Sequence, residues 1–151
     1  MLTGKYKGET VSKTYIPVAL RELVSNRSDG SCEYCRINQM FSGLSFQIDH
    51  IISETHGGET TPENLAYSCA VCNHLKHANL AAYLPELKRA FILFHPRVDV
   101  WVEHFTLEVS GKINFLSDSG KATGRLLRMN REEAVEERRL QLKLGIIQVS
   151  K

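Results

Sequence analysis

The apolar positions in the first half of the chain follow two different spacings. After Pro17, which suits a first helical turn, apolar residues recur as on one face of a helix, and the turn-forming stretch NRSDGS (26–31) predicts where that helix ends. The stretch FSGLSFQIDHII (41–52) instead alternates, with Phe46 and Ile48 on one side, which predicts a strand. ETHGGETTPEN (54–64) is rich in turn formers and predicts a loop.

The second half predicts a mixture of helices and short strands. LAYSCAVCNHLKHANLAAYL (65–84) is typical of a knuckle that opens into a helix, and PELKRAFILF (85–94) favours a further helix. In HPRVDVWVEHFTLEV (95–109), the pattern places Trp101, Phe105, Leu107 and Val109 on one strand face. The stretches SGK (110–112) and SDSGK (117–121) indicate turns around a short strand at 113–116.

A terminal helix completes the predicted order of elements. Asn130 and Glu133 have the spacing of a capping box, and Gly145 is a typical stop after Leu144. With no repeat, low-complexity tract or clear linker, the 151 residues predict one α+β domain, 1–151. No apolar run is long enough to span a membrane, and Met1–Lys13 has no apolar core typical of a secretory signal, so we expect a soluble cytoplasmic protein.

The charge of the chain is unevenly distributed. The formal net charge is +2; residues 121–151 carry eight basic and four acidic side chains, whereas residues 32–120 carry six and ten. Binding of a polyanion would therefore depend on local basic patches rather than on overall charge.

Four cysteines form two C-x-x-C pairs, Cys32 with Cys35 and Cys69 with Cys72. In a reducing compartment such pairs are more often metal ligands than disulfides, and two pairs can close a tetrahedral site around Zn²⁺. Four thiolates around one Zn²⁺ carry a formal charge of −2. A site closed by four sulfurs is structural rather than catalytic; buried free thiols or a redox pair are the alternatives.

Asp49 and His50 lie between the two pairs. A carboxylate can hold a hard divalent cation, and an adjacent imidazole can take a proton from water near neutral pH. Alternation along a strand would aim these two side chains at opposite faces, unless a bend or bulge brings them together.

The spacings around this dipeptide resemble those of the HNH endonuclease family, also called ββα-metal or His-Me finger nucleases. Asn64 follows His50 by fourteen residues and Asn73 follows Asn64 by nine, within the order DHI, GG, NL and C-x-x-C-N-x-x-K. The resemblance covers residues 32–77 most clearly. It implies a ββα-metal core at about 30–80 with zinc knuckles, extended by flanking helices and a small C-terminal strand and helix region.

The resemblance also implies a role for each matching residue. His50 would be the general base, and Asn64 would brace the loop so that His50 points correctly. Asp49 and Asn73 would hold the catalytic metal, Mg²⁺ or Mn²⁺, and His77 is a candidate third ligand that would also admit Ni²⁺. At His77 many bacterial relatives have glycine, so a solvated helix histidine is the alternative there.

Several basic residues are candidate contacts to nucleic acid. Lys76 matches the lysine of the family motif, and Arg97 has the reach for a bidentate phosphate contact; a solvated charge and a structural ion pair are the respective alternatives. The terminal basic set offers a surface that could track a phosphate backbone, or a solvated helix face: Arg125, Arg128 and Arg131. The other histidines, His56, His74, His95 and His104, fit exposed or packing positions better than catalytic ones.

The combined prediction is a metal-dependent endonuclease that hydrolyses DNA and leaves 5′-phosphate and 3′-hydroxyl ends, as the resemblance implies. Two other functions fit parts of the pattern. A non-catalytic zinc-knuckle module that binds DNA or a protein would explain the cysteines but not Asp49, His50, Asn64 and Asn73. An RNase on the same scaffold is chemically equivalent, because the reaction does not need a deoxyribose.

Overall fold

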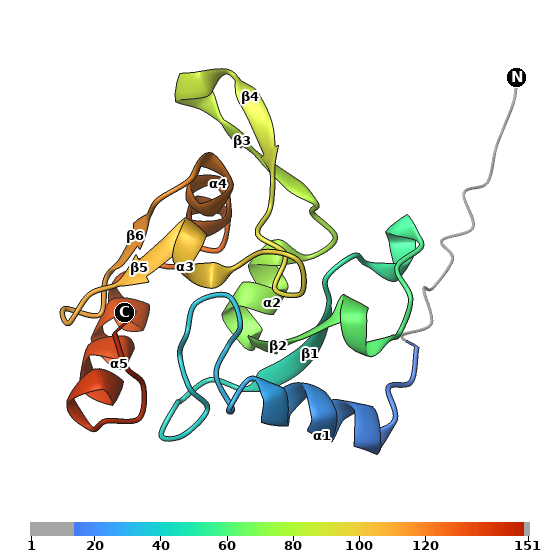
Figure 1. The fold of residues 1–151 in the computed structure, drawn as a ribbon, viewed down its shortest axis with the longest axis horizontal. Helices are drawn as coiled ribbons and strands as arrows, with labels where there is room; N and C mark the ends of the chain where they lie inside the picture. The colour runs from blue at the N-terminus through green and yellow to red at the C-terminus, as the bar shows by residue number, and fades with distance from the viewer. Residues whose placement is uncertain (1–13, 150–151) are drawn as a thin grey trace, which may run out of the picture.

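The computed structural model describes residues 14–149 of the chain, so the prediction for Met1–Lys13 lies outside the described residues. Helices and short two-stranded antiparallel sheets alternate along the chain, an α+β arrangement as expected (Figure 1). No helix within 14–149 is long and apolar enough to cross a bilayer.

The predicted ββα unit is present. Strand β1 (Phe46–His50) pairs antiparallel with β2 (Leu65–Cys69), and helix α2 (Ala70–Lys76) follows β2 directly. One face of this hairpin packs on α1 (Val18–Arg27), because Phe46 and Ile48 join the apolar cluster around Val24. The other face of β1 lies against α2, so α1 and α2 sandwich the strand pair.

The connection between β1 and β2 is the predicted loop. It is shaped by two 3₁₀ turns, Glu54–His56 and Pro62–Asn64. Before β1, the first cysteine pair lies in a turn that Ser31 and Asn38 close with an isolated bridge.

The prediction of a helix over 85–94 is wrong. After a 3₁₀ turn at Pro85–Leu87, the chain forms strand β4 (Arg89–Ile92), which pairs antiparallel with β3 (Ala81–Leu84). Lys88 between them adopts a left-handed conformation, with φ of 51°, which ends the turn and sends the chain back along β3. Cross-strand pairing and packing on a later helix outweigh the local helical pattern.

The predicted long strand after His95 is also wrong in part. Trp101 begins a short helix, α3 (Trp101–His104), and only β5 (Phe105–Leu107) is strand, paired with β6 (Ile113–Phe115). Val109 lies beyond the strand and is 79% exposed, so the four apolar residues do not share one face.

SDSGK is not a turn but the start of helix α4 (Asp118–Leu126), which Ser117 caps by accepting a hydrogen bond from the Gly120 amide. In the middle of α4, Gly124 permits close packing on β6: a Cβ there would lie 2.2 Å from the Phe115 ring.

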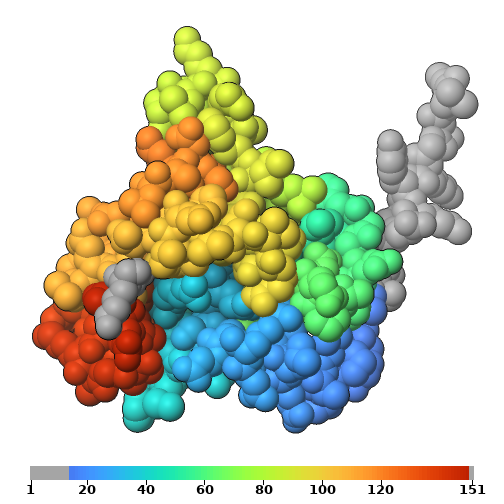
Figure 2. Space-filling view, viewed as in Figure 1, coloured from blue at the N-terminus to red at the C-terminus, as the bar shows by residue number. Residues whose placement is uncertain are grey.

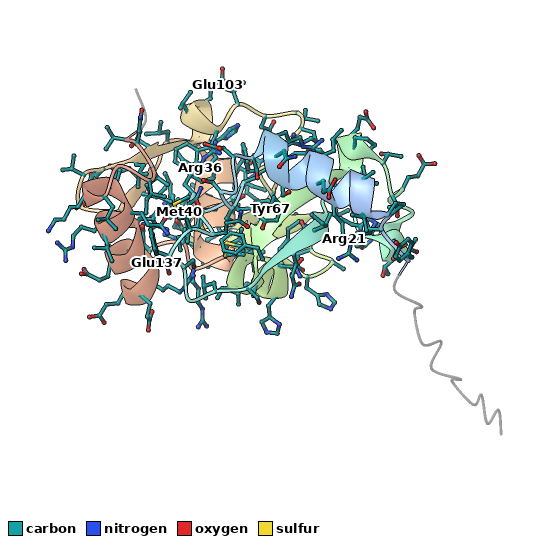
Figure 3. All side chains as sticks on the ribbon, turned by 90° about the horizontal axis from the view of Figure 1, so that it is seen from below. Arg21, Arg36, Met40, Tyr67, Glu103 and Glu137 are labelled. Atoms are coloured by element: carbon teal, nitrogen blue, oxygen red, sulfur yellow. The ribbon has the colours of Figure 1, made fainter. Side chains whose placement is uncertain are left out.

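The terminal helix α5 (Glu132–Lys143) ends as predicted at Gly145, whose φ of 70° only glycine adopts freely. The capping box is wrong: Asn130 instead exchanges two hydrogen bonds with the backbone of Ile113, and Arg131 stands at the N-cap without a side-chain cap. In Figure 3, Glu137 on α5 lies toward the left and Arg21 on α1 toward the right, and the C-terminal end of α1 lines one cavity with residues 144–146 after α5.

One buried apolar cluster joins the cysteine turn to the C-terminal half. It contains the four cysteines together with Tyr34, Trp101, Phe105 and Met129. The zinc-knuckle region and the later helices therefore share a core.

Candidate active site and metal centre

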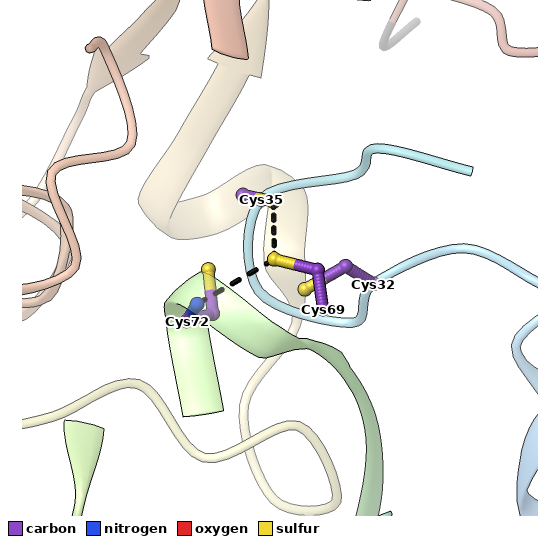
Figure 4. A group of neighbouring side chains, drawn as sticks. All are labelled: Cys32, Cys35, Cys69 and Cys72. Carbon is purple, nitrogen blue, oxygen red and sulfur yellow. Dashed lines mark hydrogen bonds between the residues drawn. The ribbon is translucent and has the colours of Figure 1, made fainter. Parts of the chain in front are cut away.

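The four cysteine side chains converge at one point inside the fold (Figure 4). All four are buried and unbridged, and their sulfur atoms lie within 4.8 Å of one another. The Sγ atoms of Cys35 and Cys69 are 3.8 Å apart. Zinc bound tetrahedrally at about 2.3 Å from each sulfur would place the sulfurs about 3.8 Å apart, so the quartet fits a structural zinc ion.

Local backbone geometry positions the two pairs. The amide of Arg36 donates to the Cys32 carbonyl, and Arg36 adopts a φ of 66°, which closes the first knuckle. Cys69 is the N-cap of α2, where its sulfur accepts from the Cys72 amide at 3.5 Å. Donation from Cys32 and Cys35 lowers the pKa of the Cys69 thiol, whereas contact with Cys32 raises the pKa of Cys72 well above its usual range. A bound dication would supply the charge that lets all four ionise.

Two guanidinium groups lie close to this quartet. Arg138 is fully buried and donates to the carbonyl oxygens of Cys35, Gly111 and Met129, and no acidic side chain within 14–149 forms an ion pair with it. Arg36 stacks on the Trp101 ring at 4.7 Å. Burial lowers the pKa of both arginines, and the negative charge of the nearby thiolates opposes this. The two cations match the −2 charge of a zinc tetrathiolate.

Asp49 lies on the α2 side of β1, in a buried ion pair. Its Oδ2 is 3.1 Å from Lys76 Nζ and accepts a 2.7 Å hydrogen bond from the Tyr34 hydroxyl. Lys76 Nζ also donates to the His50 carbonyl at 3.1 Å. Burial raises the pKa of the Asp49 carboxyl, and Lys76 and Tyr34 oppose the rise. Lys76 Nζ thus lies among three oxygens, the two of the Asp49 carboxylate and the His50 carbonyl.

His50 projects from the opposite side of β1. The ladder is unbroken from Phe46 opposite Cys69 to His50 opposite Leu65, so no bulge turns the imidazole toward the Asp49 side. The ring is half-buried, and its Nε2 lies 2.9 Å from the Thr60 hydroxyl, in the loop between the strands.

Asn64 makes the hydrogen bonds that bracing of this loop requires. Its Oδ1 accepts from the Ile52 amide, and its Nδ2 donates to the carbonyls of Ile52 and Glu59, each at 2.9 Å. The loop returns so closely that a Cβ on Gly58 would lie 1.7 Å from the Ile52 carbonyl oxygen. The second glycine of the GG motif is therefore required by this approach, and the bracing fixes the segment directly after His50.

The comparison with known families agrees with this arrangement. Residues 32–79, about a third of the chain, match the family model described as HNH endonuclease. We call the matched segment, residues 32–79, the HNH domain after the family that it resembles. No curated protein sequence matches the chain.

The other two candidate ligands of the HNH domain, Asn73 and His77, lie on α2 and at its C-cap. Asn73 Nδ2 donates to the side chain of Gln47, which lies two residues before Asp49 on the same face of β1. His77 is exposed at the C-cap of α2. Within 14–149 the cysteine quartet is the only group of three or more His, Cys, Asp or Glu side chains close enough to share a metal ion. The assignment of Asp49, Asn73 and His77 to one catalytic metal stays a prediction.

Three of the predicted phosphate contacts have acidic partners within the protein. Lys76 is 2% exposed and paired with Asp49, so neither a surface phosphate contact nor a solvated charge describes it. Arg97 forms an ion pair with Glu33, which was the alternative expectation. Arg125 pairs with Glu86 in the turn between β3 and β4, whereas Arg128 is exposed and takes part in none of the ion pairs within 14–149.

Three of the other histidines contact a backbone group or a hydroxyl, and the fourth, His74, is exposed. His56 Nε2 lies 3.0 Å from the Ala78 carbonyl, and His104 Nδ1 lies 2.6 Å from the Ser117 hydroxyl. His95 Nδ1 accepts from the Arg97 amide, and His74 is exposed on α2. Sequence reasoning missed four residues that contact the site, because no motif marks them and three of them reach it from elements other than β1: Tyr34, Gln47, Thr60 and Arg138.

Proposed function

We propose that the protein is a metal-dependent endonuclease that hydrolyses DNA, with His50 as the general base. The observation that carries the proposal is the position of His50 within the matched HNH domain. Its ring contacts Thr60 on a loop that Asn64 ties to the backbone after the strand, so the imidazole is held in one orientation. A fixed orientation is what a general base needs.

The Thr60 contact indicates which nitrogen would act. If Nε2 carries the proton and donates to the Thr60 hydroxyl, the lone pair of the neutral ring is on Nδ1. Nδ1 would then accept a proton from the water that attacks phosphorus in line with the leaving 3′-oxygen. Hydrolysis would leave 5′-phosphate and 3′-hydroxyl ends.

Asp49 and Asn73, with His77 as a third candidate, would hold the catalytic metal. Carboxylate and amide oxygens suit Mg²⁺ or Mn²⁺, and the histidine would also admit Ni²⁺. When bound, the cation supplies charge stabilisation at the scissile phosphate. Because Lys76 now neutralises Asp49, its ammonium would have to withdraw from the carboxylate when the metal binds.

Cleavage of supercoiled plasmid in the presence of Mg²⁺, Mn²⁺ or Ni²⁺ tests the proposal. His50→Ala should lower the rate about 10²–10⁴-fold, as loss of a general base typically does. His74→Ala is the matched control, because His74 is exposed on α2 away from the strand and should leave the rate unchanged. Equal rates for the wild type and His50→Ala would refute the assignment, and preferential cutting of a matched RNA strand would establish the RNase alternative.

The buried pair of Asp49 and Lys76 favours a second candidate function. A carboxylate already neutralised by an internal cation has less need of a metal, which suits a zinc-containing module that binds DNA or protein without cutting it. DNA binding with no cleavage in any of the three metals would select this function.

A further inference from the structure

The β3–β4 hairpin projects from the body of the molecule (Figures 1 and 2). Cross-strand pairs Ala81 with Ile92 and Tyr83 with Ala90 lie on one of its faces, and all four residues are exposed. Tyr83 is 59% exposed and Ile92 77% exposed. An open apolar face with an aromatic ring at its centre is unusual on a surface unless a partner covers it.

The opposite face of the hairpin is held rigidly by α4. Leu84 is buried there, and the Ser119 hydroxyl donates to the Ile92 carbonyl at 2.8 Å. At the turn, Glu86 Oε1 lies 2.6 Å from Lys121 Nζ and 2.9 Å from Arg125 Nη1. The open face is therefore presented in a fixed position, so little conformational entropy would be lost when it binds.

The hairpin and α4 are also where positive charge gathers. Together, residues 80–94 and 118–126 carry four basic and two acidic side chains, whereas the rest of the described chain carries eleven basic and fourteen acidic ones. Lys88 and Arg89 are exposed at the tip; Arg89 pairs with Leu84 on the face opposite Tyr83, and its guanidinium lies 4.8 Å from the centre of the Phe91 ring on that same face. A polyanion would be attracted to this part of the molecule and repelled by the remainder.

The hairpin is continuous with the HNH domain. A cavity of about 190 Å³ lies where the two meet, lined by Ile51, Ile52 and Lys76 from the domain and by Leu80, Ile92 and Leu93 from the hairpin. Ile51 follows the proposed base directly in the sequence. A strand lying along the open face would therefore run toward the candidate active site.

We propose that the open face of the β3–β4 hairpin binds the nucleic-acid strand that the HNH domain would cut. Lys88 at the tip would contact a phosphate, Arg89 would add positive charge at the same tip from the opposite face, and Tyr83 would stack on a base, with Ile92 beside it. Cationic side chains at the backbone and an aromatic ring beneath the bases are the two parts of a surface that binds single-stranded or locally opened nucleic acid. This inference rests on the proposed nuclease function, and it names the element that would grip the substrate.

Binding of fluorescent single-stranded and duplex oligonucleotides, measured by anisotropy in the non-cutting His50→Ala protein, tests the inference. Tyr83→Ala should weaken binding of the single strand about fivefold or more, and Tyr83→Phe, which keeps the ring, should restore it. The double variant Lys88→Ala/Arg89→Ala should reduce the slope of log K against log salt by about 0.7 for each lost phosphate contact. Thermal melting should show that all variants remain folded, because these side chains are exposed.

The control variants carry matched changes on another exposed element. Leu140→Ala and Lys143→Ala remove an apolar side chain and a cation from α5, and both should leave binding unchanged. Unchanged affinity and salt slope in folded Tyr83→Ala and Lys88→Ala/Arg89→Ala would overturn the role of the hairpin.

Two further outcomes separate failure of the hairpin from failure of the nuclease. If wild-type protein cuts DNA in a manner dependent on His50 while the hairpin variants bind and cut normally, the hairpin proposal fails and the function stands. If Ile92→Ser dissociates a dimer in sedimentation without changing nucleic-acid binding, the face is a contact between two copies and the proposal is wrong. Absence of nucleic-acid binding by the wild type would overturn both.

Discussion

Lys76→Met should strongly destabilise the protein in the absence of an activating metal. Lys76 is 2% and Asp49 5% exposed, and the substitution keeps the length of the side chain while removing the ammonium 3.1 Å from the carboxylate. Of the contacts to the Asp49 side chain, only the Tyr34 hydrogen bond would remain. Breaking a buried pair by removing one partner costs about 3–5 kcal/mol. Typical domains have about 5–15 kcal/mol of unfolding free energy, so a loss of this size is readily measured.

The loss of unfolding free energy in Lys76→Met should be larger at high pH than at low pH. Burial already raises the pKa of Asp49, and removal of Lys76 takes away the main opposing influence. The folded state of the variant therefore binds the Asp49 proton more tightly than the unfolded state does. The destabilisation should be largest above the raised folded pKa and should shrink as the pH falls through it.

Urea unfolding at neutral pH, with the zinc content held constant, is the assay. The double variant Asp49→Asn/Lys76→Met removes both charges and should recover part of the loss, which gives the coupling between the two side chains. If Asp49 is also a ligand, Mn²⁺ should replace the missing cation and stabilise Lys76→Met, by about 2.7 kcal/mol at a hundredfold excess over its dissociation constant. Stabilisation of the wild type by Mn²⁺ should be smaller, because Lys76 competes.

Two results would refute this reasoning. Unfolding free energies of Lys76→Met and wild type that agree within 0.5 kcal/mol, about the scatter of ordinary surface substitutions, would show that no buried ion pair is lost. Equal stabilisation by Mn²⁺ of Lys76→Met and the double variant would show that Asp49 does not bind the metal.

Three further predictions concern the zinc centre and the hairpin. Cys69→Ser should lose one bound zinc and unfold locally, measured by metal content and circular dichroism; a folded, zinc-free, active variant would contradict it. Arg138→Met should weaken zinc retention against a chelator about 10–100-fold, as changes around metal ligands do, whereas Arg139→Met, at a half-buried arginine that pairs with Glu136, should not. Lys121 and Arg125 lower the pKa of Glu86 to about 2, so carboxyl NMR should find Glu86 still ionised at pH 4.5. The ion pairs of Glu86 with Lys121 and Arg125 stabilise the fold fully above the ordinary glutamate pKa, and this stabilisation is lost as the pH falls toward 2. A measured pKa of Glu86 near 4.5 would show that these ion pairs are absent in solution.

The sequence predicted those parts of the fold and site that depend on near neighbours. Alternation placed β1, the C-x-x-C spacing placed the zinc ligands, and the interval from His50 to Asn64 identified the braced loop. Each of these signals is contained in a short stretch, or in a motif whose spacing is fixed by the local backbone.

What the sequence did not predict depends on partners far along the chain. The stretch 85–94 has an apolar pattern that fits a helix, but its pairing with β3 and its packing on α4 decide the outcome. Lys76 has the position of a phosphate contact in the motif, yet Asp49, 27 residues earlier, takes its ammonium into the core. Arg125 is likewise withdrawn from a basic surface by Glu86, 39 residues away.

Helix α5 supplies a buried positive charge beside the cysteine quartet, which a zinc ion bound there would need. A zinc tetrathiolate buried in apolar surroundings carries a charge of −2, and burial of such charge is costly without compensation. Arg138, 103 residues after Cys35, donates to the carbonyl of that ligand residue, and Gln141 both accepts from the Asn38 amide and donates to its carbonyl. Arg138 in turn has no acidic partner within 14–149, so its positive charge and the negative charge of a zinc tetrathiolate would compensate each other. The cysteine quartet of the matched segment, 32–79, is therefore supported by a helix that lies outside that segment.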